Sequence, residues 1–329
     1  MPKVSVILPV FNGGKYISDS IRSILDQSFQ DFEIIVIDDG SIDDTKDKIS
    51  KFKDSKLIFF RFENNKGLIA ALNFGLEKAT GDYIARMDAD DIACSNRLKN
   101  QVNFLEEKKD FVACGMAIER IPLKQHKYPP QLDQEIRAGL IFSNVFYHST
   151  MMIRSKILKD YHLKYEYDFF LCEDYRLWTR LIQYGKMANL TKIGVKYRIH
   201  EQQITRKLDY DFNRRLQLVR NNYLVFFGVN LSYSELFLFN KFCEGGQLSK
   251  LDFFDLNLIM EKIYYEIPSA IKDEFSSVYI QFLFHYLSKN LVLCSRSYIY
   301  IYISTKTGKF SLMQFLKLIK RDVKTLIIN

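Results

Sequence analysis

Residues 33–41 read EIIVIDDGS, an apolar run that ends abruptly in two acidic residues. Comparable apolar runs occupy Val4–Leu8, Leu57–Phe62 and Tyr83–Met87. Between these runs, apolar residues recur at helical spacing in Tyr16–Asp26, Asp43–Phe52 and Gly67–Ala79. Strands that are apolar throughout and alternate with helices are typical of a parallel sheet with both faces covered. The sequence therefore predicts an α/β protein with a mostly parallel central sheet flanked by helices.

Polar residues follow three of the predicted strands: Pro9–Asn12, Asp38–Ser41 and Asp88–Asp91. In sheets of this kind, ligands bind beyond the carboxyl ends of the strands. We therefore expect the three segments to meet at one rim and form a binding site there. Neither GxGxxG nor GxxxxGK[ST] occurs, which excludes the Rossmann fingerprint and the Walker loop.

The pattern loosens after Arg97. Further elements are predicted near residues 98–107 (helix), 111–115 (strand), 146–153 (strand), 173–184 (helix) and 192–199 (strand), with a polar stretch at 124–131. From about residue 206 the chain becomes helical, aromatic and basic. We expect two domains, an α/β domain at 1–205 that carries the binding site and a helical C-terminal extension at 206–329.

The 329 residues are 47% hydrophobic, enough to bury a large core, and carry a net charge of +8. Residues 1–205 contain 30 Lys/Arg and 28 Asp/Glu, a difference of +2, whereas residues 206–329 contain 17 and 11, a difference of +6. Basic residues of the tail alternate with Leu and Ile rather than clustering, which argues against nucleic acid as a partner.

Leu312–Ile328 combines an apolar stripe at helical spacing with four basic residues on the other face, Lys317, Lys320, Arg321 and Lys324. This pattern predicts a basic amphipathic helix. It fits a segment lying on anionic lipid, and it equally fits a helix packed on the catalytic domain. Tyr298, Tyr300 and Tyr302 are compatible with an interfacial belt or with a strand.

Five widely separated cysteines without a CxxC pair argue against a disulfide framework and a zinc site, and favour a reducing compartment. No apolar run approaches the roughly 18 residues that span a bilayer. We expect a cytoplasmic protein, with peripheral attachment to the inner face of the cell membrane as the alternative that the tail leaves open.

Three acidic segments are chemical candidates. Asp88-Ala89-Asp90 could present oxygens to a hard divalent cation, although acids there also cap helices. A carboxylate of Asp38-Asp39 could accept a hydrogen bond from a base or ribose, or stabilise a turn. Glu173 and Asp174 begin a predicted helix, whose dipole favours the ionised carboxylate that a general base needs. Each segment alone is compatible with a purely structural role.

Five blocks together are more specific: VSVILPVFNGGKYI (4–17), FEIIVIDDGSIDDT (32–45), NNKGLIAALNFGLEKATGDYIARMDADD (64–91), EDYRLWTRL (173–181) and YRIH (197–200). Their content and order resemble the family 2 glycosyltransferases of bacterial polysaccharide assembly, over roughly residues 1–205. The resemblance implies a GT-A fold and a nucleotide-sugar donor, with a UDP-sugar favoured. Beyond residue 205 we find no resemblance.

The resemblance also implies roles for individual residues. Donor-binding roles fall on Pro9, Phe11, Asn12, Asp39, Lys66, Arg86 and Asp88. Asp88, Asp90 and His200 would hold Mn²⁺ or Mg²⁺. Asp174 matches the catalytic base, with His148, Glu173 and Trp178 on the acceptor side.

The expected function is an inverting, metal-dependent transfer of a hexose or N-acetylhexosamine from a UDP-sugar to a glycan or lipid-linked saccharide hydroxyl. The setting would be O-antigen, capsule or lipooligosaccharide synthesis. Inversion follows from one base opposite the leaving group and no second acid placed as a nucleophile. A metal-dependent phosphohydrolase and a non-catalytic sugar-binding scaffold are the alternatives.

Overall fold

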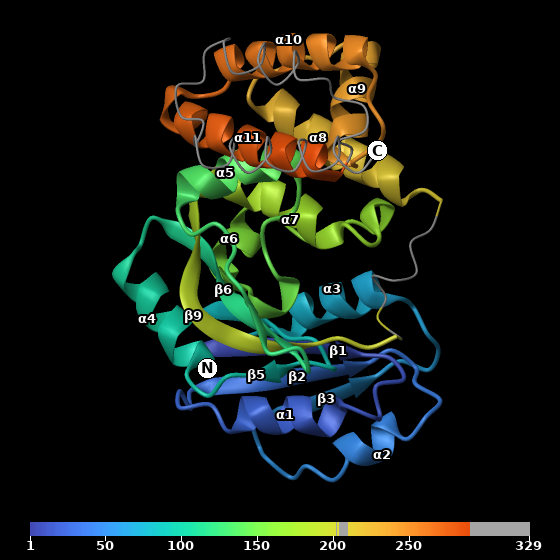
Figure 1. Cartoon of the computed structure of the whole chain (residues 1–329). Coiled ribbons are helices and arrows are strands. Elements are labelled where there is room, and N and C mark those ends of the chain that lie inside the picture. Colours follow the sequence, from blue (N-terminus) through green and yellow to red (C-terminus); the bar gives the residue numbers. More distant parts are fainter. Residues whose placement is uncertain (202, 204–209, 290–329) are drawn as a thin grey trace. The chain divides into compact units, whose positions relative to one another are not determined.

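The computed structural model describes residues 1–201, 203 and 210–289, and its first half alternates strands and helices as predicted (Figure 1). In chain order the elements are β1 (Val4–Val10), α1 (Ile17–Leu25), β2 (Phe32–Asp38), α2 (Thr45–Ile49), β3 (Leu57–Arg61), α3 (Leu68–Lys78) and β4 (Tyr83–Arg86). The strands lie in the order β3-β2-β1-β4 and are parallel to one another. Every residue of β1, β2 and β4 is buried, which explains why their sequences are mostly apolar.

Five further strands extend this sheet: β5 (Ile92–Ala93), β6 (Phe111–Ile121), β7 (Gln125–Lys127), β8 (Met152–Arg154) and β9 (Lys186–Arg198). The short strand β8 lies antiparallel between β4 and β6, and β9 runs parallel to β6. Strands β5 and β7 pair antiparallel with β9 and β6. The sheet is therefore mixed beyond β4, and the α/β prediction is confirmed.

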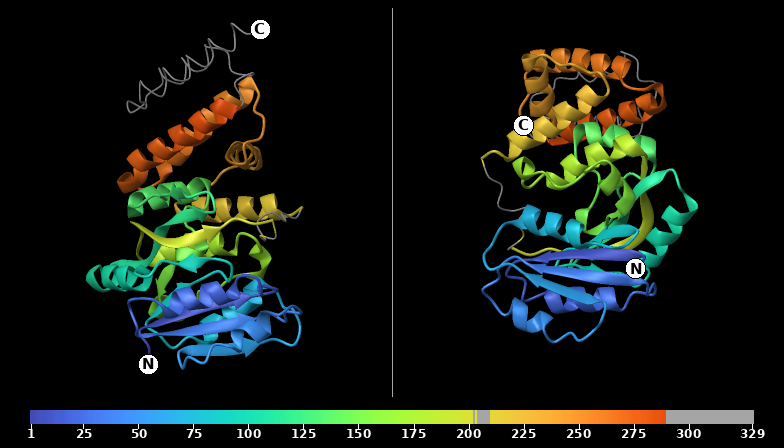
Figure 2. Two further views of the ribbon diagram at one scale, coloured as in Figure 1. Left: turned by 60° about the horizontal axis from the view of Figure 1, so that its bottom comes forward. Right: turned by 180° about the vertical axis from the view of Figure 1, so that it is seen from behind.

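Helices cover both faces of the sheet. The remaining helices of this region are α4 (Arg97–Glu107), α5 (Asp133–Phe142), α6 (Ser155–Asp160) and α7 (Glu173–Leu181), with single turns η1 (His148–Thr150), η2 (Tyr167–Phe169) and η3 (Ile182–Tyr184). Figures 1 and 2 show α1 and α2 against one face of the parallel strands and α3 against the other. The carboxyl ends of β1, β2 and β4 are each followed by a loop.

Strand β1 differs from its prediction, which ended it at Pro9. The strand continues to Val10, and Pro9 stands in register with Ile37 of β2. On the other edge, β4 pairs with β1 only as far as Ile7. A proline lacks the N–H that a central strand normally donates. It is tolerated here because no strand among the described residues pairs with that edge of β1 beyond Ile7.

The middle of the chain was predicted less well. Helix α5 was not predicted, and strands β6 and β9 are longer than the predicted 111–115 and 192–199. The predicted strand at 146–153 is the turn η1 followed by β8. Every residue from Leu140 to Phe142 at the end of α5 is buried, so the helix lacks a clear polar face that would mark its period.

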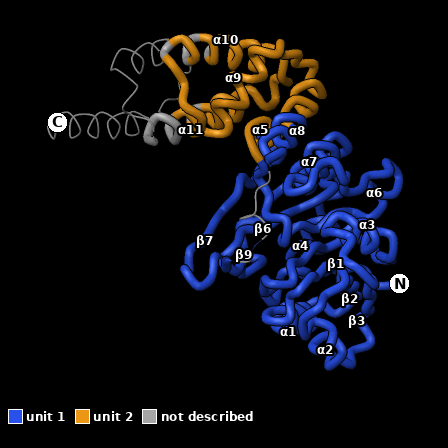
Figure 3. Tube along the Cα trace, turned by 90° about the vertical axis from the view of Figure 1, so that its right-hand side faces the viewer, with its two compact units in different colours: residues 1–136, 144–219 blue, residues 137–143, 220–329 orange. Residues whose placement is uncertain are grey.

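Contacts divide the chain into two compact units, residues 1–136 with 144–219 and residues 137–143 with 220–329 (Figure 3). The described part of the second unit is helical, as predicted, with α9 (Tyr233–Cys243), α10 (Lys250–Glu266), η5 (Ser269–Ile271) and α11 (Lys272–Lys289). Helix α8 (Phe212–Phe226) spans the boundary between the units. The predicted boundary near residue 205 stays a prediction.

The core of the second unit gathers around Phe142. Its ring stacks on Phe275 at 5.5 Å and on Phe282 at 4.9 Å between centroids. Within the described ranges, no helix has the length and apolarity needed to cross a membrane. The predicted amphipathic helix at Leu312–Ile328 and the tyrosines at 298–302 lie outside the described residues.

Candidate functional site

The loops after β1 and β2 are hydrogen-bonded to each other. The Asn12 N–H donates to the Ser41 hydroxyl at 2.8 Å, and the Ile42 N–H donates to Asn12 Oδ1 at 3.0 Å. Asn12 has a left-handed backbone (φ 50°), which asparagine tolerates better than most residues. Of its predicted neighbours in the donor site, Pro9 is buried within β1 and Phe11 is 49% exposed on the loop. Asn12 therefore holds the two loops together.

Asp39 joins the end of β2 to the start of α3. Its Oδ1 accepts the Lys66 N–H at 2.7 Å, and its Oδ2 accepts the Gly67 N–H at 2.9 Å. Burial raises the pKa of this carboxyl, while the two backbone donors counteract the rise. Each oxygen keeps a further lone pair. The carboxylate can therefore accept another hydrogen bond while it fixes the loop that carries Lys66.

The acidic cluster after β4 consists of Asp88, Asp90 and Asp91, and one carboxylate oxygen from each lies within 4.8 Å of the other two. The Arg86 guanidinium forms an ion pair with Asp88. His200 Nε2 lies 2.7 Å from Asp90 Oδ2, so the structure brings together these two predicted metal ligands.

The carboxylates of the cluster lie close together, and this affects the pKa values of Asp88 and Asp91. Burial raises the pKa of Asp88 and raises that of Asp91 well above its usual range, and neighbouring carboxylates add to both shifts. A divalent cation would relieve this repulsion, and carboxylate oxygens are the ligands that Mn²⁺ and Mg²⁺ prefer. The residues present therefore fit a bound divalent cation.

Arg198 also belongs to the site, although the sequence analysis did not select it. Its Nε donates to the Asp90 carbonyl at 2.8 Å, and its N–H donates to Asp91 Oδ1 at 2.9 Å. The guanidinium lies over the Tyr16 ring, 4.7 Å from the centroid. Its place in the YRIH block, two residues before His200, was the available signal. Arg198 fixes the backbone of the acidic cluster from the end of β9.

A second pair of carboxylates stands in the first turn of α7. Asp174 Oδ1 accepts the Tyr175 N–H at 2.6 Å, and Oδ2 accepts the Asn144 side-chain N–H at 2.7 Å. Burial raises the pKa of Asp174 to about 6. Burial and the neighbouring Asp174 charge raise the pKa of Glu173 to about 7. Among the described residues, the buried Oε2 of Glu173 has no hydrogen-bond partner.

An aromatic group packs beside these carboxylates. His148 Nε2 lies 2.8 Å from the Tyr165 hydroxyl, and the His148 ring meets the ring of the buried Trp178 edge-on at 5.8 Å. Burial and the Arg86 charge hold the pKa of His148 well below its usual range. The imidazole is therefore neutral at pH 7, and with the indole it offers neutral hydrogen-bonding groups beside Asp174.

Arg86 connects the two halves of the site. It is 4% exposed, pairs with Asp88, and its positive charge lowers the pKa values of Glu173 and Asp174. In the described part of the chain, no hydrogen bond or ion pair between side chains joins the acidic cluster directly to Asp174. A buried guanidinium therefore stands between a cation-binding cluster and a basic carboxylate, and its charge acts on both.

The sequence was compared with known proteins. The model of the family "Glycosyl transferase family 2" matches residues 5–162. EpsE of Bacillus subtilis, described as a putative glycosyltransferase, is 32% identical over 68% of this chain and 86% of its own length. The chain belongs to the family 2 glycosyltransferases. WfaP of Escherichia coli, a UDP-Glc:alpha-D-GlcNAc-diphosphoundecaprenol beta-1,3-glucosyltransferase, is 29% identical over 73% of this chain and 92% of WfaP.

Solved structures share the fold of this family 2 glycosyltransferase. TarS of S. aureus in complex with UDP-GlcNAc superposes with a TM-score of 0.61 at 18% identity, covering 85% of this chain and 92% of TarS. The mannosyltransferase PcManGT of Pyrobaculum calidifontis, in complex with GDP-Man and Mn²⁺, gives a TM-score of 0.52 at 16% identity, covering 99% and 87%. The predicted GT-A fold is thereby confirmed.

Proposed function

We propose that the chain is an inverting, metal-dependent glycosyltransferase that moves a hexose or N-acetylhexosamine from a UDP-sugar to a saccharide hydroxyl. One observation carries the proposal: the buried Arg86 acts on both a cation-fitting acidic cluster and a raised-pKa carboxylate, Asp174. WfaP, named for a UDP-glucose donor, and TarS, which binds UDP-GlcNAc, support a UDP-sugar. The diphosphoundecaprenol-linked acceptor of WfaP supports a lipid-linked saccharide in surface polysaccharide synthesis.

On the donor side, Asp88, Asp90 and His200 would hold Mn²⁺ or Mg²⁺. When bound, the cation supplies charge stabilisation for the departing nucleoside diphosphate. The Mn²⁺ complex of PcManGT supports a divalent ion of this kind. The joined loops of Asn12, Ser41 and Asp39 would position the base and ribose, since they present a free lone pair and a rigid backbone at the ends of β1 and β2.

On the acceptor side, Asp174 would take the proton from the attacking hydroxyl. With a pKa of about 6 it is ionised at pH 7, yet more basic than an ordinary aspartate. Its hydrogen bonds from Tyr175 and Asn144 fix the carboxylate orientation. Glu173, with a pKa of about 7, is substantially protonated and suits a hydrogen-bond donor to the acceptor rather than a nucleophile. A site with one general base and no nucleophilic carboxylate predicts a single displacement, with inversion at the anomeric carbon.

The donor assignment is tested by thermal shift and hydrolysis with UDP-, GDP- and dTDP-sugars, each with Mn²⁺, Mg²⁺ or EDTA. A ligand that binds only the folded chain raises the Tm. We expect a rise with a UDP-sugar plus cation, its loss in EDTA, and slow release of UDP. A simple phosphomonoester should remain intact. A folded sample whose Tm none of these combinations changes would contradict the proposal.

The base assignment is tested by Asp174→Asn. Turnover should fall by about 10²–10⁴-fold, because the acceptor proton loses its positioned base. The Tm rise with a UDP-sugar and cation should persist, since Asp174 is not placed on the donor side. Proton NMR of the product should show the anomeric configuration opposite to that of the donor. Full turnover by the folded variant would remove Asp174 from the mechanism.

A further inference from the structure

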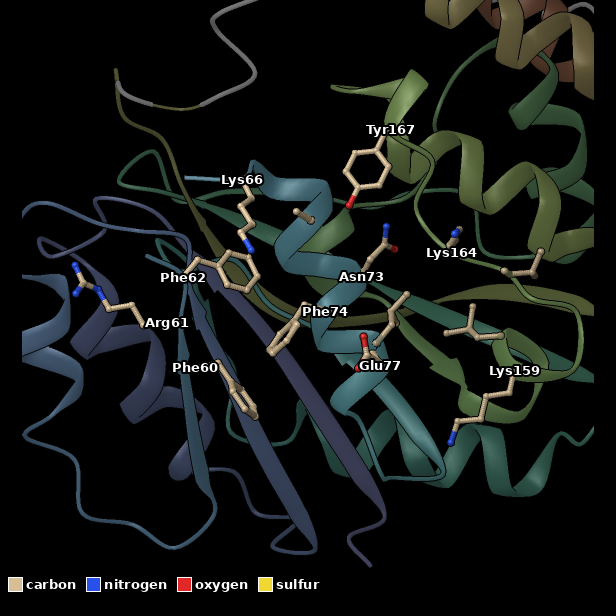
Figure 4. Close-up of a pocket in the computed structure, with 14 residues that line it drawn as sticks. Phe60, Arg61, Phe62, Lys66, Asn73, Phe74, Glu77, Lys159, Lys164 and Tyr167 are labelled. Atoms are coloured by element: carbon tan, nitrogen blue, oxygen red, sulfur yellow. The ribbon is translucent and has the colours of Figure 1, made fainter. Parts of the chain in front are cut away.

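A second concave site lies in the first unit, away from the acidic cluster. It is a groove of about 790 Å³ between β3 and α3 on one side and the segment 158–167 on the other (Figure 4). This volume falls within the roughly 300–1,000 Å³ of ligand pockets. Lys66 lines the groove, and its backbone N–H also contacts Asp39. The groove therefore begins at the loop that borders the proposed donor site.

The groove is aromatic along its length. The Phe74 ring meets Phe60 at 5.0 Å and Phe62 at 5.3 Å, both edge-on. Tyr167, 63% exposed, lies opposite these rings with its hydroxyl directed towards α3 (Figure 4). The ammonium groups of Lys66 and Lys78 lie over the Phe62 and Phe74 rings, 4.7 and 5.1 Å from the centroids. Beside these groups the half-exposed rings offer their remaining apolar surface, and the tyrosine adds a polar tip. Such a surface suits the C–H faces and hydroxyls of sugar rings.

The groove is also positively charged. Lys66, Lys159 and Lys164 line it and are exposed, and none forms an ion pair with a carboxylate in the described part of the chain. The one carboxylate among the lining residues, Glu77, lies 3.0 Å from the ammonium group of Lys78. Three lysines without a carboxylate partner, one of which (Lys66) lies over the Phe62 ring, are complementary to a ligand that carries negative charges as well as sugar rings.

The walls of the groove are fixed relative to each other. The Asn73 side chain donates to the Tyr165 carbonyl at 2.9 Å and accepts the Tyr165 N–H at 3.0 Å. The Tyr165 hydroxyl in turn contacts His148 of the proposed acceptor side. Tyr165, which is buried, thus links Asn73 in the groove wall to His148 of the proposed acceptor side.

We propose that the groove binds an acidic saccharide chain, with sugar rings against Phe62, Phe74 and Tyr167, and carboxylate or phosphate substituents on the lysines. This inference rests on the function proposed above, because the chain would be the distal part of the acceptor glycan. It specifies the acceptor as an anionic saccharide. An apolar partner would leave the three ammonium groups without counter-charges.

The test is calorimetric titration of the full chain with two probes, a hyaluronan hexasaccharide, which carries carboxylates, and chitohexaose, which is neutral. We expect the acidic probe to bind more tightly and its affinity to fall with added salt. Tyr167→Ala should weaken it by at least about tenfold, a loss of about 1.4 kcal/mol. The double variant Lys159→Glu/Lys164→Glu should abolish it.

Matched controls are Tyr128→Ala, at a tyrosine that is also exposed, and Lys51→Glu/Lys99→Glu, which changes the net charge equally at exposed lysines outside the groove. Neither control should change the affinity. The three groove positions and the three control positions are all exposed, so each variant should keep the Tm of the unmodified chain. Equal weakening by groove and control variants would overturn the inference.

Two further readouts separate the outcomes. Donor-induced Tm rise and slow hydrolysis of the UDP-sugar by water need only the donor side, so the groove variants should retain both. If these readouts hold while neither probe binds, the groove inference fails and the proposed function stands. If the unmodified chain shows no donor response, the proposed function fails. Polyuridylate binding as strong as that of the acidic hexasaccharide would indicate a general polyanion site and overturn the saccharide assignment.

Discussion

Glu173 and Asp174 are neighbours in the chain, but their surroundings differ. Asp174 receives two hydrogen bonds, which oppose the effect of burial, and its pKa is about 6. Burial and the charge of Asp174 raise the pKa of Glu173 to about 7. Two adjacent carboxyls whose pKa values are held apart by their surroundings suit an acid and a base. In the mechanism proposed above, the donors on Asp174 therefore favour this residue over Glu173 as the base.

Asn144→Ala should move the acidic limb of the pH profile of kcat/KM. The Asn144 hydrogen bond lowers the pKa of Asp174, so its loss raises that pKa, and activity should begin to rise at a higher pH. The acidic limb of the unmodified enzyme should lie near pH 6. The matched control is Asn103→Ala, at an exposed asparagine of α4. A limb that stays in place in Asn144→Ala would show that Asn144 does not tune Asp174.

Glu173→Gln should raise the Tm at pH 8 and leave it nearly unchanged at pH 5. The pKa of Glu173 is about 7 in the folded chain and about 4.5 when unfolded, so the folded chain binds the extra proton between these values. Stability therefore falls as pH rises from about 4.5 to 7, and glutamine, which mimics the protonated form, avoids this loss. We expect a gain of a few degrees at pH 8. An equal Tm change at both pH values would contradict the raised pKa.

Sequence motifs identified the acidic residues, because Asp88, Asp90 and Asp174 stand at fixed positions beside strand and helix ends. The partners of these acids were not identifiable in the same way. Asn144 contacts Asp174 across 30 residues of chain, and Tyr165 contacts Asn73 across 92. Such contacts depend on how the elements pack, and no local spacing encodes them. The roles of the predicted site residues remain predictions for the experiments above.

Among the elements, α3 sets the position of the loop that carries Lys66. Its first turn follows the Asp39–Gly67 hydrogen bond, and its middle lies directly on the sheet. A Cβ at Gly75 would come within 2.5 Å of Ile7 Cγ2 and 3.1 Å of Ile37 Cδ1. Glycine here permits close packing of the helix on β1 and β2. The distance between α3 and the sheet therefore determines the position of this loop.

Gly75→Ala should destabilise the chain, although alanine is normally the better helix former. The added methyl group overlaps two buried side chains, at a cost of about 1–3 kcal/mol that exceeds the helix-propensity gain of about 1 kcal/mol. The free energy of unfolding in urea is the measurement. Glu77→Ala, exposed on the same helix, should change it by no more than about 0.5 kcal/mol. A more stable Gly75→Ala would mean that α3 can move away from the sheet.

Elements with a clear burial pattern were predictable from the sequence. Strands β2 and β4 are buried throughout, and their sequences are mostly apolar. Helix α5 was missed, because its apolar residues crowd at one end. The extension of β1 through Pro9 was missed because the tolerance of that proline depends on where β4 stops pairing. The pairing of β4 is a property of the assembled sheet and cannot be read from the sequence of β1.

At the scale of the whole molecule, the order of the strands assembles the site within the first unit. Strand β8 lies antiparallel beside β4. This pairing places the turn that contains His148 next to the C-terminal end of β4, where Arg86 lies. Strand β9 returns to bring Arg198 and His200 to the acidic cluster. The sequence predicted the helices and parallel strands, but pairing between distant strands is not encoded in any local pattern. The mixed half of the sheet could therefore not be derived.

The second unit should depend strongly on Phe142. This side chain is fully buried, and its ring packs against Phe239, Phe275 and Phe282. Phe142→Ala should cost about 3–5 kcal/mol of unfolding free energy for the unit that contains it. Chemical denaturation followed by circular dichroism is the measurement. Phe237→Ala, at a 61% exposed phenylalanine of α9, is the matched control and should have little effect. Equal losses of unfolding free energy in the two variants would mean that Phe142 is not central to the core of this unit.

The membership of residues 137–143 in the second unit has a consequence for biosynthesis. The ribosome releases Phe142 long before it has made Phe275 and Phe282, the rings that later cover it. At roughly 5–20 residues per second, the nascent chain waits on the order of ten seconds. During this interval the first unit can already form its parallel strands, while a short apolar segment within it stays uncovered.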